Sequence, residues 1–167
     1  MTNLARAIVE QAARRPDLRL GTVDDQITLA SAVSAAAATA HALGVSAGRR
    51  VAVVAASSTD YVVTWLACLL AGAPVALVNP TYPDDLTQRM LATLGPDLVL
   101  RADEVVLARR HGAVDPVGLP GLDGEPAALA SFMHTSGTTG IPKFCAQSHD
   151  YFARLAAAMA NALDLTA

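Results

Sequence analysis

The chain has 167 residues, of which 53% are hydrophobic and 16% are charged, and its formal net charge is −3. This length allows one ordinary domain with a real core. The negative charge and the absence of a Lys/Arg cluster argue against a nucleic-acid partner. The low fraction of charged residues is typical of a sheet covered by helices on both faces, and equally of a piece of a larger protein.

Helices and strands are predicted to alternate along the chain. Apolar residues recur at helical spacing in residues 3–15, opposite charged ones, which is typical of an amphipathic helix. The short, continuous apolar run at residues 50–56 is typical of a strand buried on both faces. Helices are expected over residues 3–15, 29–43, 60–71, 84–94, 103–111 and 150–163. Strands are expected over residues 18–23, 50–56, 75–78, 97–101, 130–135 and 144–147.

This alternation predicts an α/β fold, with a mostly parallel sheet flanked by helices. Residues 112–128 are rich in glycine and proline and are expected to form a mobile surface connection. The chain has no internal repeat.

Location and redox state are predicted from what the sequence lacks. Charged residues interrupt any apolar stretch near the N-terminus, so no signal peptide is expected. The longest apolar run, residues 61–78, is broken by Gly72 and Pro74, which predicts core elements and no membrane span. Cys68 and Cys145 lack metal-ligand spacing and are expected to be two small buried hydrophobic residues in a reduced cytoplasm.

The most informative segment is residues 134–143, which read His-Thr-Ser-Gly-Thr-Thr-Gly-Ile-Pro-Lys. Glycines let a backbone turn several N–H groups toward one point, hydroxyls add donors, and a lysine adds a mobile positive charge. Such a segment suits a polyphosphate.

Two common nucleotide-binding patterns do not fit this segment. In the P-loop, a second glycine precedes the lysine and a hydroxyl residue follows it. Here Pro142 and Phe144 occupy those positions, and proline has no N–H to offer a phosphate. The glycine pattern of dinucleotide-binding folds is absent after the early strands.

Residues 135–143 instead resemble the signature loop of the adenylate-forming superfamily, which includes acyl- and aryl-CoA synthetases, luciferases and the adenylation domains of peptide synthetases. Other segments resemble family segments in the same order along the chain, namely residues 26–29, 44–53, 69–74, 79–80 and 148–149. The family usually has Gly-Val after the lysine, whereas Phe144 and Cys145 stand here. Phe144 is expected either to crowd the loop or to pack beneath it.

The resemblance implies a role for each matching residue. Lys143 and His149 are the expected catalytic residues, with His149 lining the acyl pocket or the nucleotide, although a lone histidine at a strand end is otherwise usually structural. His134, just before the loop, is more often structural. The residues expected to bind the phosphates of ATP are Thr135, Ser136, Gly137, Thr138, Thr139, Gly140 and Lys143.

The resemblance also implies a reaction. In the family, a carboxylate attacks the α-phosphorus of ATP, acyl-AMP and pyrophosphate form, and a thiol then takes the acyl group. Residues 1–167 match only the N-terminal part of such an enzyme, so the Mg²⁺ ligands, the ribose-binding aspartate and the C-terminal lid domain with its lysine are expected outside this sequence. No metal ligand is therefore assigned here.

Two functional classes follow. The first is the N-terminal segment of an ATP-dependent acid–thiol ligase, and an acyl- or aryl-CoA synthetase is favoured over a peptide-synthetase domain. This segment is expected to be inactive as an isolated chain. The second is a catalytically silent truncated domain that binds phosphate or another protein. The expected partners are ATP, a carboxylic acid, the thiol of coenzyme A or phosphopantetheine, and either the rest of the enzyme or a second copy of the chain.

Overall fold

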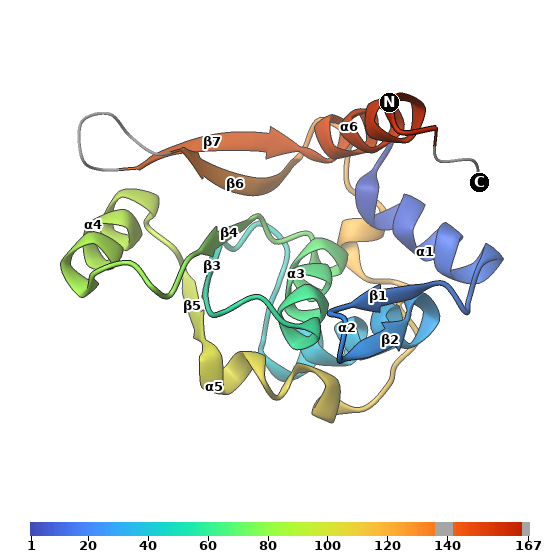
Figure 1. The fold of residues 1–167 in the computed structure, drawn as a ribbon, viewed down its shortest axis with the longest axis horizontal. Helices are drawn as coiled ribbons and strands as arrows, with labels where there is room; N and C mark the ends of the chain where they lie inside the picture. The colour runs from blue at the N-terminus through green and yellow to red at the C-terminus, as the bar shows by residue number, and fades with distance from the viewer. Residues whose placement is uncertain (136–141, 165–167) are drawn as a thin grey trace.

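A five-stranded sheet forms the centre of the molecule (Figure 1). The structure is a computed structural model, and it describes residues 1–135 and 142–164. The strand order is β5-β3-β4-β6-β7, in which β3 to β6 are parallel and β7 is antiparallel to β6. The strands are β3 (Val51–Val54), β4 (Val75–Val78), β5 (Leu98–Arg101), β6 (Leu129–Thr135) and β7 (Lys143–Ser148). The predicted α/β fold with a mostly parallel sheet is confirmed.

Helices occupy nearly all of the predicted positions. They are α1 (Leu4–Arg14), α2 (Leu29–Ala42), α3 (Thr59–Ala71), α4 (Asp84–Leu94), α5 (Ala102–Val105) and α6 (His149–Ala162). The helix predicted over residues 103–111 is divided into α5 and the 3₁₀ turn η1 (Ala108–His111). A small hairpin of β1 (Arg19–Gly21) and β2 (Gln26–Thr28) lies outside the main sheet, and β2 was not predicted because three residues carry too little periodicity.

The central strands β3 and β4 are covered on both faces. Successive strand residues point to opposite sides, so Val51, Val53 and Val75 pack against α1, α2 and α3. Val54 and Val78 point the other way and pack against α4. Burial on both faces explains why the central strands are continuous apolar runs.

Side-chain caps set the starts of four helices. Backbone N–H groups donate to Asn3 at the start of α1, to Thr28 at the start of α2, to Ser58 at the start of α3 and to Ser148 at the start of α6. Gly72 ends α3 at a φ of 71°, a conformation that glycine adopts without strain. Local chemistry therefore predicts these boundaries well.

Part of the connection at residues 112–128 is packed, and the prediction of a simple surface connection was wrong there. The 3₁₀ turn η2 (Pro120–Leu122) lies against the end of α3, and Gly121 is buried. A Cβ added at Gly121 would lie 2.0 Å from the carbonyl oxygen of Leu69. The Asn3 amide donates to the carbonyl oxygens of Gly121 and Gly124 at 3.0 and 2.6 Å.

The two cysteines differ in environment. Cys68 is fully buried in α3, which raises the pKa of its thiol to about 12, as expected for an inert core residue. Cys145 is exposed on β7, so the prediction of two buried cysteines was wrong for this one.

Within residues 1–135 and 142–164, no helix is both long and apolar enough to cross a membrane.

Candidate functional site

A crevice lies at the carboxyl ends of β3 and β4. The chain leaves β3 for α3 on one face of the sheet and leaves β4 for α4 on the other. In open α/β sheets, ligands bind where neighbouring strands send their connections to opposite faces. A cavity of about 320 Å³ occupies this position, and its lining includes Ser57 after β3, Asn79 after β4 and His134 of β6.

The crevice is lined by both apolar and polar side chains, and no aspartate, glutamate, lysine or arginine is among its described lining residues. The Asn79 side-chain oxygen accepts from the backbone N–H and the hydroxyl of Thr81, both at 2.9 Å. The same cavity is lined by Tyr61, whose phenol has its pKa raised to about 12 by burial, so that it stays a neutral donor. The crevice therefore suits a ligand with polar groups.

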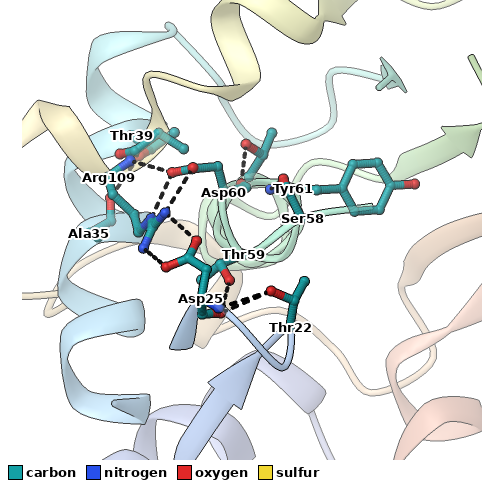
Figure 2. Close-up of polar contacts among 11 residues, drawn as sticks. Thr22, Asp25, Ala35, Thr39, Ser58, Thr59, Asp60, Tyr61 and Arg109 are labelled. Atoms are coloured by element: carbon teal, nitrogen blue, oxygen red, sulfur yellow. Dashed lines mark hydrogen bonds and ion pairs between the residues drawn. The ribbon is translucent and has the colours of Figure 1, made fainter. Parts of the chain in front are cut away.

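A cluster of ionic side chains lies at the start of α3 (Figure 2). The Arg109 guanidinium of η1 donates to both carboxylate oxygens of Asp25, at 2.9 and 2.6 Å. It also donates to both oxygens of Asp60, in the first turn of α3, at 2.8 and 3.1 Å. The hydrogen bond from Arg109 holds the pKa of Asp25 below its ordinary value. The cluster ties η1 and the β1–β2 turn to the start of α3.

No pattern in the sequence points to this cluster. Arg109 lies 84 positions from Asp25 and 49 positions from Asp60, so only the tertiary structure joins them.

The β6–β7 hairpin brings two predicted phosphate-binding residues together. Thr135 and Lys143 are partners in the strand register, and both are exposed. Within the described part of the chain, no carboxylate forms an ion pair with Lys143. The other predicted phosphate-binding residues lie outside the described residues; they are Ser136, Gly137, Thr138, Thr139 and Gly140.

Phe144 packs beneath the hairpin. Its half-buried ring joins the apolar cluster of Val54, Val78 and Met90. It also makes edge-on contacts with the rings of Phe132 and His134, at centroid distances of 6.5 and 6.4 Å. This packing anchors β7 to the α4 side of the sheet, whereas residues 136–141 of the loop lie outside the described residues.

His149 lies far from Lys143. It follows the last residue of β7, and six residues of extended strand span about 20 Å. Its side chain is only 3% exposed, burial lowers the pKa of the imidazole, and Nδ1 has no hydrogen-bond partner among the described residues. The structure therefore brings Thr135 and Lys143 together but leaves His149 at the other end of the strand.

Comparison with known proteins identifies the family. The family model described as "AMP-binding enzyme" matches residues 8–166. The chain belongs to the AMP-binding enzyme family.

Its relatives include both peptide synthetases and a CoA ligase. The chain is 33% identical over 157 residues to the phosphinothricin tripeptide synthetase PhsC of Streptomyces viridochromogenes. The alignment covers 81% of the chain and 14% of PhsC. It is also 33% identical over 121 residues to the 2-succinylbenzoate–CoA ligase of Escherichia coli, which covers 69% of the chain and 26% of that protein. The chain thus spans about a quarter or less of these relatives.

Solved structures share the fold of this AMP-binding chain. The o-succinylbenzoate CoA synthetase of Bacillus subtilis, in complex with the intermediate OSB-AMP, matches with a TM-score of 0.82 and 23% identity, covering 99% of the chain and 38% of that protein. The N-terminal subdomain of NpsA from Klebsiella oxytoca matches with a TM-score of 0.79 and 23% identity, covering 93% and 42%.

The Mg²⁺ that the family implies has no site in the described part of this AMP-binding chain. Within residues 1–135 and 142–164, no three His, Cys, Asp or Glu side chains are grouped so that they could hold a metal ion. The nearby carboxylates Asp25 and Asp60 are neutralised by Arg109. The described residues therefore do not fit a metal ion.

Proposed function

We propose that this chain is the N-terminal segment of an ATP-dependent carboxylate-activating ligase, which forms an acyl-AMP and then a thioester. The observation that carries the proposal is the pairing of Thr135 with Lys143 at the end of a hairpin, in a chain of the AMP-binding family. The hairpin rises from the same sheet edge as the crevice, to which β6 contributes His134.

In this proposal the hairpin binds the β- and γ-phosphates of ATP. When a carboxylate attacks the α-phosphorus, negative charge builds on the oxygen that leaves with pyrophosphate. The Lys143 ammonium and the hydroxyl of Thr135 stabilise that charge, and one preorganised donor of this kind contributes about 3 kcal/mol to the transition state. The glycines and hydroxyls between them are proposed to complete the phosphate site.

His149 remains a proposed site residue with a different place in the reaction. Its position at the far end of β7 directs it away from the phosphates. We therefore assign it to the acyl group rather than to the leaving pyrophosphate. Its buried, neutral imidazole suits a wall of a pocket.

The thiol acceptor is proposed to be coenzyme A, in line with the structural match to a CoA synthetase. A carrier-bound phosphopantetheine is the second candidate, because PhsC and a linear gramicidin synthase of Brevibacillus parabrevis, at 33% and 32% identity, are peptide synthetases. Thioester formation measured with each thiol separates the two.

The isolated 167-residue chain is proposed to lack useful adenylation activity. Its described residues hold no metal site, and the motif with the family's catalytic C-terminal lysine is not among the segments that resemble the family. ATP–pyrophosphate exchange with a panel of carboxylic acids tests this. Robust turnover by the chain alone would refute it. Absence of phosphate binding as well would favour the alternative of a protein-interaction module.

Phosphate binding can be measured on this chain because Lys143 is its only lysine. Reductive methylation modifies only the Lys143 amine and the N-terminal amine, and mass spectrometry resolves the two. Pyrophosphate or ATP should slow modification of Lys143 at least threefold, while the N-terminal amine serves as the internal control. Equal protection of both amines, or of neither at saturating pyrophosphate, would contradict the proposed phosphate site.

A further inference from the structure

A second cavity lies on the α4 side of the sheet, between the end of α4 and the β6–β7 hairpin. Its volume is about 560 Å³, which lies in the range of small-molecule pockets. Phe132, Phe144 and Leu94 supply apolar walls, and Arg50 is also a lining residue. The cavity shares no described lining residue with the crevice at the ends of β3 and β4, and His149 does not line it. It is therefore separate from the sites described above.

Arg50 is held in place through both its backbone and its side chain. Its backbone N–H donates to the Asp97 carboxylate at 2.7 Å, and its backbone carbonyl oxygen accepts from the Asp97 N–H at 2.8 Å. One N–H of its guanidinium donates to the carbonyl oxygen of Leu94 at the end of α4. The guanidinium carbon lies 5.3 Å from the centroid of the Phe132 ring, within the range of a cation–π contact. The side chain is thus fixed before any ligand binds.

The positive charge of Arg50 has no carboxylate partner among the ion pairs of the described residues. The side chain is half-buried, and burying a charge costs free energy unless the charge is paired. Arg109 differs, because two carboxylates already balance its charge. A guanidinium has five N–H donors, and the hydrogen bond to Leu94 uses one of them. The remaining donors of Arg50 suit a carboxylate, which a guanidinium binds through two parallel hydrogen bonds.

We propose that this cavity binds a small monocarboxylate with an aromatic or aliphatic body. The carboxylate accepts from the remaining donors of Arg50, and the body packs against Phe132, Phe144 and Leu94. Charge selects an anion, because both charged residues of the described lining, Arg50 and Lys143, are positive. The apolar walls favour an organic anion over inorganic phosphate, because they offer no hydrogen-bond donor. The site goes beyond the proposed function, since it requires neither phosphate binding by the hairpin nor catalysis.

NMR titration of the whole chain with 4-phenylbutyrate tests the proposal, and 4-phenylbutan-1-ol is the neutral control of similar shape. The acid should shift the backbone amide signals of Thr93, Leu94 and Ala146, which line the cavity, and should bind at least tenfold more tightly than the alcohol. Arg50→Gln should weaken binding of the acid at least tenfold, because charge-assisted hydrogen bonds are lost. The matched control is Arg49→Gln. Arg49 is also half-buried but does not line the cavity, so the affinity should stay within twofold.

A second variant keeps the test valid if Arg50→Gln unfolds the chain, since that substitution also removes a hydrogen bond from the end of α4. Thr93→Phe, at an exposed lining position, places a ring in the cavity and leaves Arg50 unchanged. It should weaken binding of the acid at least fivefold. Gln88→Phe, exposed on the same helix and outside the lining, should not.

Three results would overturn the proposal: equal affinity for the acid and the alcohol, unchanged binding of the acid in a folded Arg50→Gln or Thr93→Phe variant, or amide shifts centred on residues away from the cavity. Failure of the phosphate site would instead appear as unprotected Lys143 in the methylation experiment with pyrophosphate. The two failures are therefore separate outcomes.

Discussion

Helices α2 and α6 have the same length and are both rich in alanine, with eight and six alanines, but their surroundings are opposite. Each has 14 residues; nine are buried in α2, whereas only His149 and Asp150 are buried in α6. Alanine favours a helix in both places, since it loses no side-chain entropy. The comparison teaches that composition decides that a helix forms, while the layers around it decide whether it belongs to the core.

The same contrast extends to the elements beside each helix. α2 packs on α3, which in turn covers β3 and β4, whereas the β6–β7 hairpin carries two predicted phosphate-binding residues and α6 is largely exposed. We therefore expect stability to reside in the α2–α3 layer and ligand responses to reside in the hairpin and α6.

The largest expected effect compares one leucine from each region. Leu70→Ala removes a fully buried side chain from α3 and should lower the free energy of unfolding by about 3 kcal/mol, through lost burial and the cavity left behind. Leu155→Ala, at an exposed position of α6, should cost less than about 1 kcal/mol. Urea unfolding followed by circular dichroism measures both, and equal losses would break the comparison.

The second prediction concerns the ionic cluster. Arg109→Ala leaves the Asp60 carboxylate, whose side chain is only 16% exposed, without its partner and should cost about 2 kcal/mol. The exposed neighbour Arg110→Ala is the matched control and should change stability by less than about 0.5 kcal/mol. Thermal unfolding of both variants measures this, and similar melting temperatures would mean that the cluster does not hold α3 in place.

The third prediction compares the two serine caps. The Oγ of Ser58 accepts from Tyr61 at 3.0 Å at the start of α3, and that of Ser148 accepts from Tyr151 at 3.2 Å at the start of α6. Replacing either by alanine should cost about 1 kcal/mol of helix stability. Hydrogen exchange should show a global loss of protection for Ser58→Ala but a loss confined to α6 for Ser148→Ala. Global loss in both would mean that α6 unfolds together with the core.

The fourth prediction is a pH dependence from His149. Because burial lowers the pKa of its imidazole in the folded chain, the unfolded chain binds the extra proton first as pH falls. Stability contributed by the neutral imidazole is therefore full above about pH 6.5 and decreases below it. Urea midpoints between pH 5 and 8 should fall more steeply on the acid side for the parent chain than for His149→Gln. The control His41→Gln, at an exposed site, should keep the slope of the parent chain. If His149→Gln also kept that slope, the burial argument would be contradicted.

The smallest expected effect on stability is that of Lys143→Ala. The side chain is exposed and forms no ion pair with a carboxylate in the described part of the chain, so unfolding should change by less than about 0.5 kcal/mol. Binding of pyrophosphate, measured by calorimetry, should weaken at least tenfold. A large loss of stability with unchanged binding would reverse the roles assigned to the core and the hairpin.

Local chemistry predicted much of the fold. The apolar run at β3, the Thr28 cap and the glycine that ends α3 act over a few residues, so their effect can be recognised in the sequence. The segment proposed to bind phosphate could be singled out for the same reason, because its residues are consecutive. The antiparallel direction of β7 and the division of the helix at residues 103–111 were not, because they depend on packing against other elements.

The sequence by itself determined the alternation of helices and strands, the family and the residues proposed to approach a phosphate, because each depends on neighbours within a few positions. Only the tertiary structure decided that Arg109 joins Asp25 and Asp60, that Phe144 packs beneath the hairpin, and that α6 presents an apolar face. These features depend on contacts between distant residues, whose positions are set by how the layers pack and not by any local pattern.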